Sequence, residues 1–205
     1  MSIKSYLYFV LLSSMFSACT PTNDELFDKA FTLSKEKKYD EAIKIYTDII
    51  SRNDQLQLAY YNRGIDYLSK KSYKEALADF NKVMSLQTLG DFHIWFNENT
   101  PVAGDVERTQ VPYNDALYQR AIVKFYMDSS RSSFIDFQTL VNDNYDQTSN
   151  CILWQGTLWV KLGKLEKACE YFQKAKQFAN TSNDKQEADE MIKTYCSNID
   201  KSKRK

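Results

Sequence analysis

Few side chains in this sequence could take part in acid–base, nucleophilic or metal chemistry. His93 is the only histidine, and a lone imidazole with no paired ligand is a poor metal or catalytic candidate. The sequence contains no glycine-rich phosphate loop and no HExxH motif, and no Ser–His pairing is available beyond His93. We therefore expect no catalytic residue, no metal site and no cofactor.

The thiol of Cys19 is the best candidate for covalent chemistry. Lys4 gives the chain a positively charged start, and the apolar run over residues 6–12 is shorter than the about 20 residues that span a bilayer. Residues 1–18 therefore fit a secretory signal peptide that ends in small residues. The ending Phe16–Ser17–Ala18–Cys19 resembles the lipobox of bacterial lipoproteins. An ordinary signal peptide that happens to end near a cysteine is the alternative.

The lipobox resemblance implies a membrane anchor. It implies that the thiol of Cys19 accepts a diacylglyceryl group and that residues 19–22 form a lipidated start with a short polar tether. More than one acyl chain, of the palmitate kind, would make this anchor stable. Residues 20–23 lack a strongly acidic tag, which favours a place at the outer membrane facing the periplasm.

Charge excludes one class of partner. Lys and Arg together number 27, as do Asp and Glu. A chain without net charge has no global field that attracts nucleic acid, so we expect no nucleic-acid partner. The basic tail of residues 200–205 is interpreted as a solvated end that suits the dipole of a preceding helix.

Three further cysteines, Cys151, Cys169 and Cys196, leave an odd number of thiols. Without a CxxC motif or a Cys/His cluster, metal binding is not indicated. Buried free thiols are the first expectation. One disulfide, between Cys169 and Cys196, is the alternative, since export leads to an oxidising compartment.

An internal repeat with a period of about 34 residues organises the rest of the sequence. Residues 26–50 match residues 60–84 at this offset, and the same spacing returns over 156–175 and, more weakly, over 117–137. The clearest matched pairs are Ala30 with Gly64, Tyr39 with Tyr73, Ala42 with Ala76, and Tyr46 with Phe80. The alternation of small and large residues at fixed places predicts closely packed helix pairs.

These positions resemble the tetratricopeptide repeat family, with four copies over roughly residues 23–56, 57–90, 114–147 and 149–182. The resemblance implies an all-α superhelix, or solenoid, of four helix-turn-helix repeats whose paired helices touch through small side chains. The residues expected at these contacts are Ala30, Ala42, Gly64, Ala76, Ala121, Ser133, Gly156 and Ala168. A capping helix is expected over residues 183–199, because stacked repeats need their last apolar face covered.

An insertion separates the second and third copies, whose starts lie further apart than one period of the repeat. It runs over about residues 88–112 and contains Trp95 and Phe96. A loop of this length is either functional or packed as a small appendage. Trp95 and Phe96 are therefore expected either to cover the junction between the two halves or to contact a partner.

The resemblance also implies a concave groove, lined by the first helices of successive repeats, that receives a protein or peptide segment. The positions facing it are Phe27, Phe31, Lys35, Tyr61, Ile65, Leu68, Tyr118, Ile122, Phe125, Tyr126, Leu153, Thr157 and Val160. A face this apolar commonly marks a partner site. The alternative is that some of these residues pack on neighbouring repeats or under the insertion.

One kind of partner is not expected in that groove. Relatives that grip chaperone tails use a two-carboxylate clamp of Lys, Arg and Asn. Here Asn62 alone corresponds to a member of the clamp, whereas Phe27, Phe31, Asp115 and Gln119 stand at other clamp positions. An acidic C-terminus would find little to hold it.

The sequence therefore predicts a membrane-anchored adaptor that acts in the assembly or regulation of a cell-envelope complex. Asp79 and Asp136 occupy matched places in two copies, which favours a surface or helix-packing role over a catalytic acid pair. The alternative function is carbohydrate or cell-wall binding, in which Trp95, Phe96 and the groove tyrosines would stack on sugars.

Overall fold

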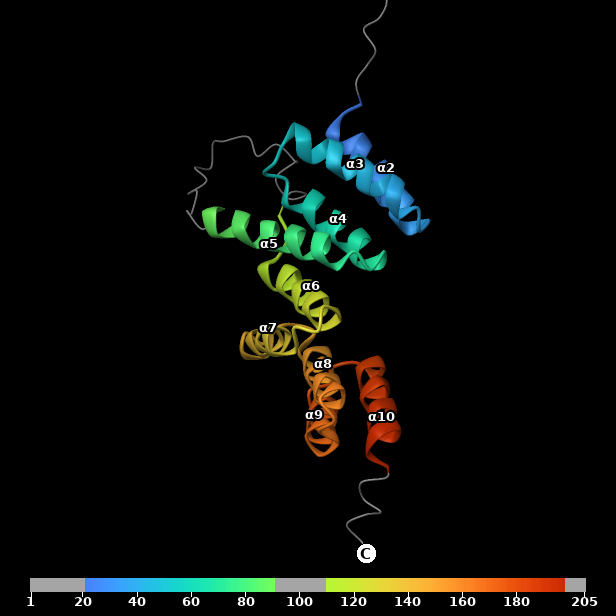
Figure 1. The fold of residues 1–205 in the computed structure, drawn as a ribbon, viewed down its shortest axis with the longest axis vertical. Coiled ribbons are helices and arrows are strands. Elements are labelled where there is room, and N and C mark those ends of the chain that lie inside the picture. Colours follow the sequence, from blue (N-terminus) through green and yellow to red (C-terminus); the bar gives the residue numbers. More distant parts are fainter. Residues whose placement is uncertain (1–20, 91–109, 198–205) are drawn as a thin grey trace, which may run out of the picture.

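The computed structural model describes residues 21–90 and 110–197 (Figure 1). The predicted signal peptide, Cys19, His93, Trp95, Phe96 and the basic tail lie outside the described residues. All regular structure in the described part is α-helical. Its helices are α2 (Asn23–Lys35), α3 (Tyr39–Arg52), α4 (Gln57–Ser69), α5 (Tyr73–Gly90), α6 (Tyr113–Tyr126), α7 (Ser130–Asn142), α8 (Thr148–Lys161), α9 (Leu165–Gln177) and α10 (Ser182–Cys196).

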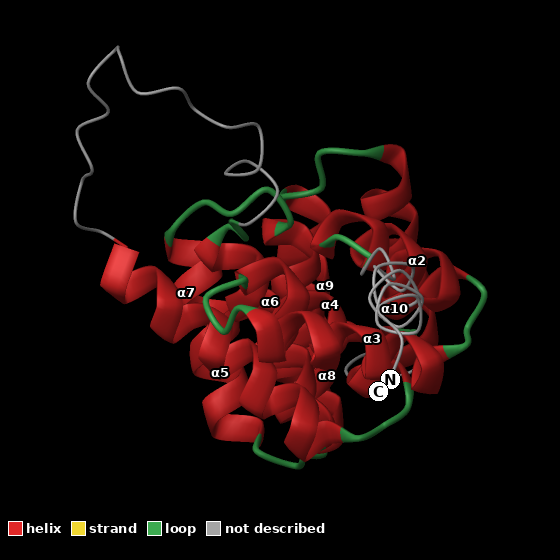
Figure 2. Cartoon of the chain, turned by 90° about the horizontal axis from the view of Figure 1, so that it is seen from above, coloured by secondary structure: helices red, strands yellow, loops and turns green. Residues whose placement is uncertain are grey.

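The helices form four consecutive pairs that stack along the long axis of the molecule (Figure 1). Each helix packs on the next one in the chain, both within a pair and between pairs. Seen along the stack, the helices of the four pairs overlap around a common axis (Figure 2). The predicted all-α superhelix of four helix-turn-helix repeats is confirmed. Within the described residues, no helix has the length and apolar character needed to cross a bilayer.

Small side chains let the paired helices approach closely. Ala30, Ala42, Ala76, Ala121, Ser133 and Ala168 are fully buried. At the two glycines of this set a Cβ atom would be crowded, slightly at Gly64, where it would stand 3.0 Å from the Phe80 ring, and severely at Gly156, where it would stand 2.5 Å from the Phe172 ring. The large residue in each pair therefore rests directly on the backbone of the facing helix.

The turn inside each repeat has the same backbone geometry. Lys37, Lys71, Asp128 and Gly163, which occupy matched positions, all have positive φ, from 58° to 69°. In each case the next residue donates its backbone N–H to a carbonyl five residues earlier, as in Lys38 to Leu33 at 2.9 Å and Lys164 to Trp159 at 2.9 Å. This is the Schellman arrangement, which closes the end of a helix, and it fixes the direction in which the second helix leaves.

Side chains also fix the start of α2. Thr22 Oγ1 accepts the backbone N–H of Glu25 at 3.2 Å, and the Glu25 carboxylate accepts the N–H of Thr22 at 2.9 Å. These two reciprocal bonds form a capping box, which closes the start of the helix. Thr181 and Asp184 form a second such box at the start of α10, where the sequence reasoning did not place one.

The disulfide between Cys169 and Cys196 joins α9 to α10. The first expectation, that all three of these cysteines are free, is therefore wrong for this pair and the alternative is confirmed. Their Cα atoms lie 5.8 Å apart because α10 packs along α9 and places its last turn beside the first turns of α9. Cys151 is a buried free thiol, as expected.

Two buried ion pairs recur at matched positions. The Asp79 carboxylate accepts two hydrogen bonds from the Arg63 guanidinium, at 2.7 and 2.8 Å, and Asp136 does the same with Arg120, at 2.8 and 2.9 Å. Lys124 adds a third bond to Asp136 at 2.7 Å. Both aspartates are at most 5% exposed. Each ties the two helices of its repeat together, as the packing interpretation of their matched spacing requires.

Candidate functional site

The residues predicted to face the groove do not form a continuous open apolar strip. Phe31 and Tyr126 are exposed, at 45% and 46%, whereas Tyr118 and Leu153 are buried, at 9% and 8%. The half-buried members are Phe27, Tyr61, Ile65, Leu68, Ile122, Phe125, Thr157 and Val160. Many of these pack against the cores between repeats. Much of the predicted face is therefore used to join neighbouring repeats.

An aromatic cluster fills the middle of the stack, between α6, α7 and α8. Trp154 stacks on Phe137 with ring centroids 6.0 Å apart and meets Phe125 edge-on at 5.0 Å. Tyr126 lies 6.3 Å from Trp154, and Tyr118 lies 6.0 Å from Phe137. Aromatic pairs at such separations stabilise their arrangement beyond simple burial. The cluster holds Trp154 rigidly at the edge of the adjoining hollow.

This hollow, of about 530 Å³, lies between α6, α8 and α10. Its lining residues are Tyr118, Asn150, Leu153, Trp154, Thr157, Glu187, Glu190 and Met191. The structure thus brings together three residues predicted to face the groove, Tyr118, Leu153 and Thr157. It adds a wall from α10, which sequence reasoning regarded only as a cap.

The floor of the hollow is apolar and contains one satisfied polar contact. Leu153, Trp154 and Met191 supply the apolar surface. Trp154 Nε1–H donates to the Tyr118 hydroxyl at 3.2 Å. Burial raises the pKa of Tyr118 to about 12, against the opposing effect of that hydrogen bond. Tyr118 therefore stays a neutral phenol at physiological pH.

The polar groups around this floor could form further hydrogen bonds and ion pairs. Asn150 Oδ1 is buried and has no hydrogen-bond partner in the described part of the chain. Glu187 and Glu190 accept bonds from the neutral amides of Asn183 and Gln186, at 3.1 and 3.2 Å. Among residues 21–90 and 110–197, no Lys or Arg forms an ion pair with either glutamate.

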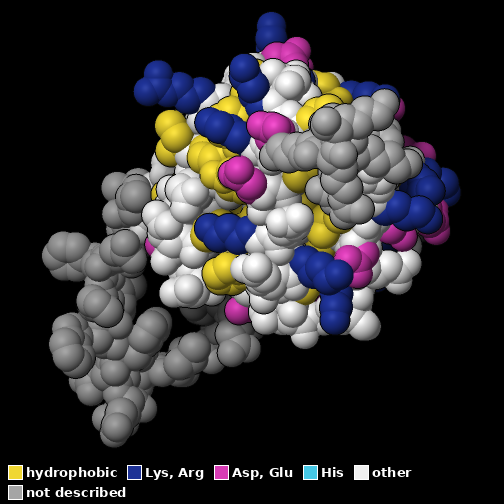
Figure 3. Space-filling view, turned by 90° about the horizontal axis from the view of Figure 1, so that it is seen from below, with side chains coloured by type: hydrophobic (Ala, Val, Ile, Leu, Met, Phe, Trp, Pro, Cys, Tyr) yellow, Lys and Arg dark blue, Asp and Glu magenta, His cyan; other side chains and the backbone are white. Residues whose placement is uncertain are grey.

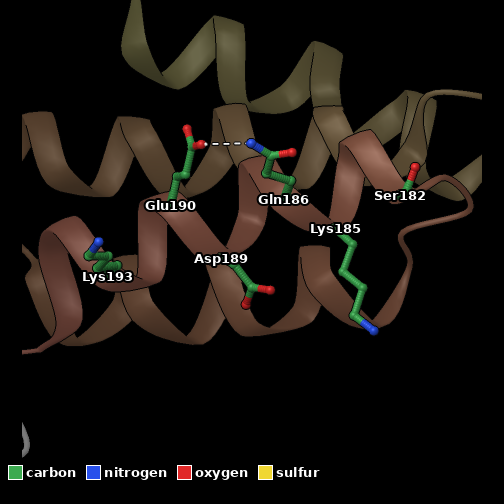
Figure 4. Close-up of a pocket in the computed structure, with 6 residues that line it drawn as sticks. All are labelled: Ser182, Lys185, Gln186, Asp189, Glu190 and Lys193. Atoms are coloured by element: carbon green, nitrogen blue, oxygen red, sulfur yellow. Dashed lines mark hydrogen bonds between the residues drawn. The ribbon is translucent and has the colours of Figure 1, made fainter.

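A second hollow, of about 340 Å³, follows the polar face of α10. Its six lining side chains all stand on that one helix, and Gln186 bonds Glu190 across its surface (Figure 4). Two lysines and two acids are among these side chains, and Asp189 pairs with Lys176 of α9. With no wall from another element, this surface is a solvated helix face.

The surface at the C-terminal end of the stack has no single sign of charge. Figure 3 shows basic and acidic side chains there with hydrophobic ones between them. In the described residues, no three His, Cys, Asp or Glu side chains gather as a metal ion would require. The hollow between α6, α8 and α10 is therefore the best-formed candidate site.

Sequence reasoning missed Trp154, Met191, Glu187 and Glu190. Trp154 adjoins Leu153, which was assigned to the groove, but the aromatic cluster turns the indole so that its edge reaches the hollow as well. The apolar spacing of Ala188, Met191 and Tyr195 indicated a helix that covers the last repeat. An acidic pair on the same side of that helix was the signal that could have identified a wall.

Comparison with known proteins places this geometry in a family context. The family model described as tetratricopeptide repeat matches residues 58–88 and, in a second form, residues 151–181. These ranges cover most of α4–α5 and most of α8–α9. The chain therefore contains tetratricopeptide repeats, as the resemblance implied.

Two curated relatives share part of the sequence. Hsp70-Hsp90 organizing protein 1 of Glycine max is 33% identical over 94 residues, which is 46% of this chain and 15% of the relative. Tetratricopeptide repeat protein 13 of Homo sapiens is 27% identical over 171 residues, which is 75% of this chain and 19% of the relative. The chain thus spans less than a fifth of the length of either relative.

Solved structures share the fold at low identity. MamA from residue 41 to its end, from Desulfovibrio magneticus RS-1, superimposes with a TM-score of 0.59 at 17% identity, over 76% of this chain and 75% of MamA. YrrB, described as a TPR protein with an unusual peptide-binding site, gives a TM-score of 0.56 at 17% identity, over 76% of this chain and 68% of YrrB. Both superpositions support the superhelix.

Proposed function

We propose that this chain, built of tetratricopeptide repeats on an α-helical superhelix, is an adaptor that binds a segment of another protein between α6, α8 and α10. The observation that carries the proposal is the hollow of about 530 Å³ with walls from all three helices. Its volume lies within the about 300–1,000 Å³ of ordinary ligand sites. It therefore suits a few side chains of an extended segment rather than a whole helix.

The chemistry of the lining suits a peptide. Apolar surface from Leu153, Trp154 and Met191 would cover side chains of the segment. Asn150 offers an amide, which can both donate to and accept from a peptide backbone. In the described part of the chain, no three His, Cys, Asp or Glu side chains gather beside this surface as a metal ion would require. Binding is thus the activity that these groups support.

The comparisons favour the same class of function. The name of the Glycine max relative describes an organiser of Hsp70 and Hsp90, and YrrB is described as having a peptide-binding site. The partner proposed here differs from a chaperone tail, since Phe27, Phe31, Asp115 and Gln119 stand where a two-carboxylate clamp would need other residues. In addition, Asp115 accepts the Tyr145 hydroxyl at 2.6 Å and is therefore used within the fold.

We further propose that the adaptor is anchored through lipidated Cys19 and acts in a cell-envelope complex at the outer membrane, facing the periplasm. The support is the sequence of residues 1–18, with its charged start, apolar run and small residues before Cys19. Cys19→Ser should abolish labelling with radioactive palmitate and release the chain from membranes. Membrane retention of unlabelled Cys19→Ser would contradict the anchor.

The binding proposal is tested by site-specific photo-crosslinking in cells. A benzophenone side chain at Thr157, on the rim of the hollow, should form an adduct with the partner. The Thr157 hydroxyl bonds only the Leu153 carbonyl of its own helix, at 2.9 Å, so its replacement removes no contact between helices. The control position is Ile135 on α7, which is 54% exposed and outside the hollow. Equal adducts from both positions would argue against the site.

A further inference from the structure

We infer that the bound segment presents a lysine or arginine beside a large apolar residue, with the cation held by Glu187 and Glu190 and the apolar side chain on Trp154 and Met191. This inference rests on the proposed function and specifies its partner. It follows from three observations: an exposed acidic pair that forms no ion pair in the described residues, an apolar floor beside it, and a buried hydrogen-bond acceptor without a partner.

The acidic pair lies on one side of α10. Glu187 and Glu190 are three residues apart, so their side chains are neighbours on the helix surface. Like charges at this spacing repel each other, and a cation placed between them relieves that repulsion. No lysine or arginine is among the residues that line the hollow. The nearest acid on the same helix, Asp189, differs in that it is paired with Lys176.

Two acids that lie between helices elsewhere in the fold are neutralised by cations. Asp79 is paired with Arg63, and Asp136 with both Arg120 and Lys124. Glu187 and Glu190 differ from these two aspartates, because both are exposed and lie beside the hollow between three helices. They are therefore free to pair with a cation that a bound segment supplies.

The apolar floor lies next to these carboxylates. Trp154 is fixed by stacking on Phe137, with ring centroids 6.0 Å apart, so its exposed edge is a rigid platform. Met191 stands one position after Glu190, and its flexible thioether adapts to side chains of different shape. A segment whose basic residue reaches Glu187 would thus place its neighbouring side chain over Trp154 and Met191.

The unused acceptor completes the site. Asn150 Oδ1 is buried without a partner in the described residues, and buried polar groups in native proteins almost always have one. Because Asn150 also lines the hollow, a rotation of its amide would bring this oxygen to a backbone N–H of the segment. Phosphate-bearing partners are disfavoured, because Glu187 and Glu190 would repel them.

The test compares three fluorescein-labelled peptides that share the same apolar residues and carry lysine, glutamine or glutamate at the charged positions. Fluorescence anisotropy with the full mature chain should rank them lysine, glutamine, glutamate. Because exposed ion pairs are individually weak, we expect about a tenfold difference between the first and the last. Added salt should reduce that difference.

Charge-reversal variants assign the effect to the acidic pair. Glu187→Lys with Glu190→Lys should reverse the ranking, and Glu187→Gln with Glu190→Gln should remove it. The control is Asp143→Lys with Glu170→Lys, two exposed acids elsewhere, which should preserve the ranking. Circular dichroism checks that every variant keeps its helical content.

Several outcomes would overturn the inference. The glutamate peptide could bind best, the ranking could survive charge reversal, or none of the three peptides could bind. If the Thr157 adduct still forms in such a case, the proposed function stands and only the partner chemistry is wrong. If the Thr157 adduct is lost as well, both the proposed function and the proposed partner chemistry are wrong. Tighter peptide binding after removal of residues 198–205 would show that the basic tail already occupies the hollow, which excludes a separate partner as its usual occupant.

Discussion

Replacing Gly156 by alanine tests the steric basis of the fold at one atom. Gly156 of α8 faces Phe172 of α9, and a Cβ atom at this position would stand 2.5 Å from Cε1 and 2.6 Å from Cδ1 of the ring. Phe172 is fully buried, and its ring lies 5.9 Å from that of Tyr195 on α10. The ring cannot retreat without moving the wall of the hollow.

The expected cost combines two opposing effects. Overpacking a well-filled core costs about 1–3 kcal/mol, whereas alanine stabilises a helix interior by about 1 kcal/mol relative to glycine. Since a 2.5 Å approach requires a shift of the ring, we place the overpacking cost in the upper part of its range, at about 2–3 kcal/mol, and expect a net loss of about 1–2 kcal/mol. For a chain of this size each kcal/mol lowers Tm by about 2–4 °C.

Gly64→Ala is the matched control. Its Cβ would stand 3.0 Å from the tip of the Phe80 ring, a contact that a few tenths of an ångström relieve. The loss from crowding should then roughly cancel the gain in helix propensity, which leaves a net change within about 0.5 kcal/mol. Urea unfolding followed by circular dichroism measures both variants. The peptide affinity of Gly156→Ala should also fall, because Phe172 supports α10 through Tyr195.

A double-mutant cycle separates ring crowding from other causes. Phe172→Leu removes ring atoms, so Gly156→Ala should cost less in that background, with a coupling of about 0.5–3 kcal/mol. A Gly156→Ala variant as stable as the parent, or as sensitive in the Phe172→Leu background as in the parent, would refute the claim that the helices touch through this glycine.

Three further predictions concern charge and backbone. Asp66 is 1% exposed, and burial raises its pKa from 3.8 to about 6, so its contribution to stability is full below about pH 4 and is lost as the pH rises through 6. Asp66→Asn should therefore increase the free energy of unfolding at about pH 7.5, by at most about 3 kcal/mol, and change it little at about pH 4. Urea titrations at the two pH values measure both effects. Asp136→Ala removes the counter-charge of two mostly buried cations and should cost about 3–5 kcal/mol of unfolding free energy; a loss below about 1 kcal/mol would contradict the role of the ion pair. Lys71 has a φ of 61°, so Lys71→Gly should raise Tm slightly. Gly163→Ala meets no atom within 4 Å of the added Cβ, but alanine at this positive φ adds about 1 kcal/mol of backbone strain and should therefore lower Tm.

The fold could be predicted because small and large side chains recur at the same positions of each repeat. Its period places Ala42 and Ala76 at the same contact, and in the structure both are fully buried. The turns were less visible. Gly163 is the residue type that a positive φ favours, and aspartate, as at Asp128, tolerates it. Lys37 and Lys71 adopt the same conformation without such a signal, because the hydrogen bonds of the turn impose it.

The candidate site was only partly predictable, because helical spacing shows which side of a helix a residue faces but not how deeply its side chain is buried. Tyr118 and Leu153 do face the hollow, yet neighbouring rings and α10 leave them only 9% and 8% exposed. The wall from α10 depends on how that helix docks, which the disulfide and the contact between Phe172 and Tyr195 determine. The disulfide was one of the alternatives that the sequence offered, whereas the contact between Phe172 and Tyr195 had no signal in the local sequence pattern.

The indole N–H signal of Trp154 in a ¹⁵N-correlated NMR spectrum reports on the hollow most directly. Trp159 serves as an internal control, because its ring packs against Phe134 and Tyr171, at 6.0 and 6.5 Å, and does not line the hollow. Titration with the lysine-bearing peptide should shift the Trp154 signal, assigned by Trp154→Phe, and leave the Trp159 signal in place. A peptide that binds while the Trp154 signal stays unchanged would contradict a binding site between α6, α8 and α10.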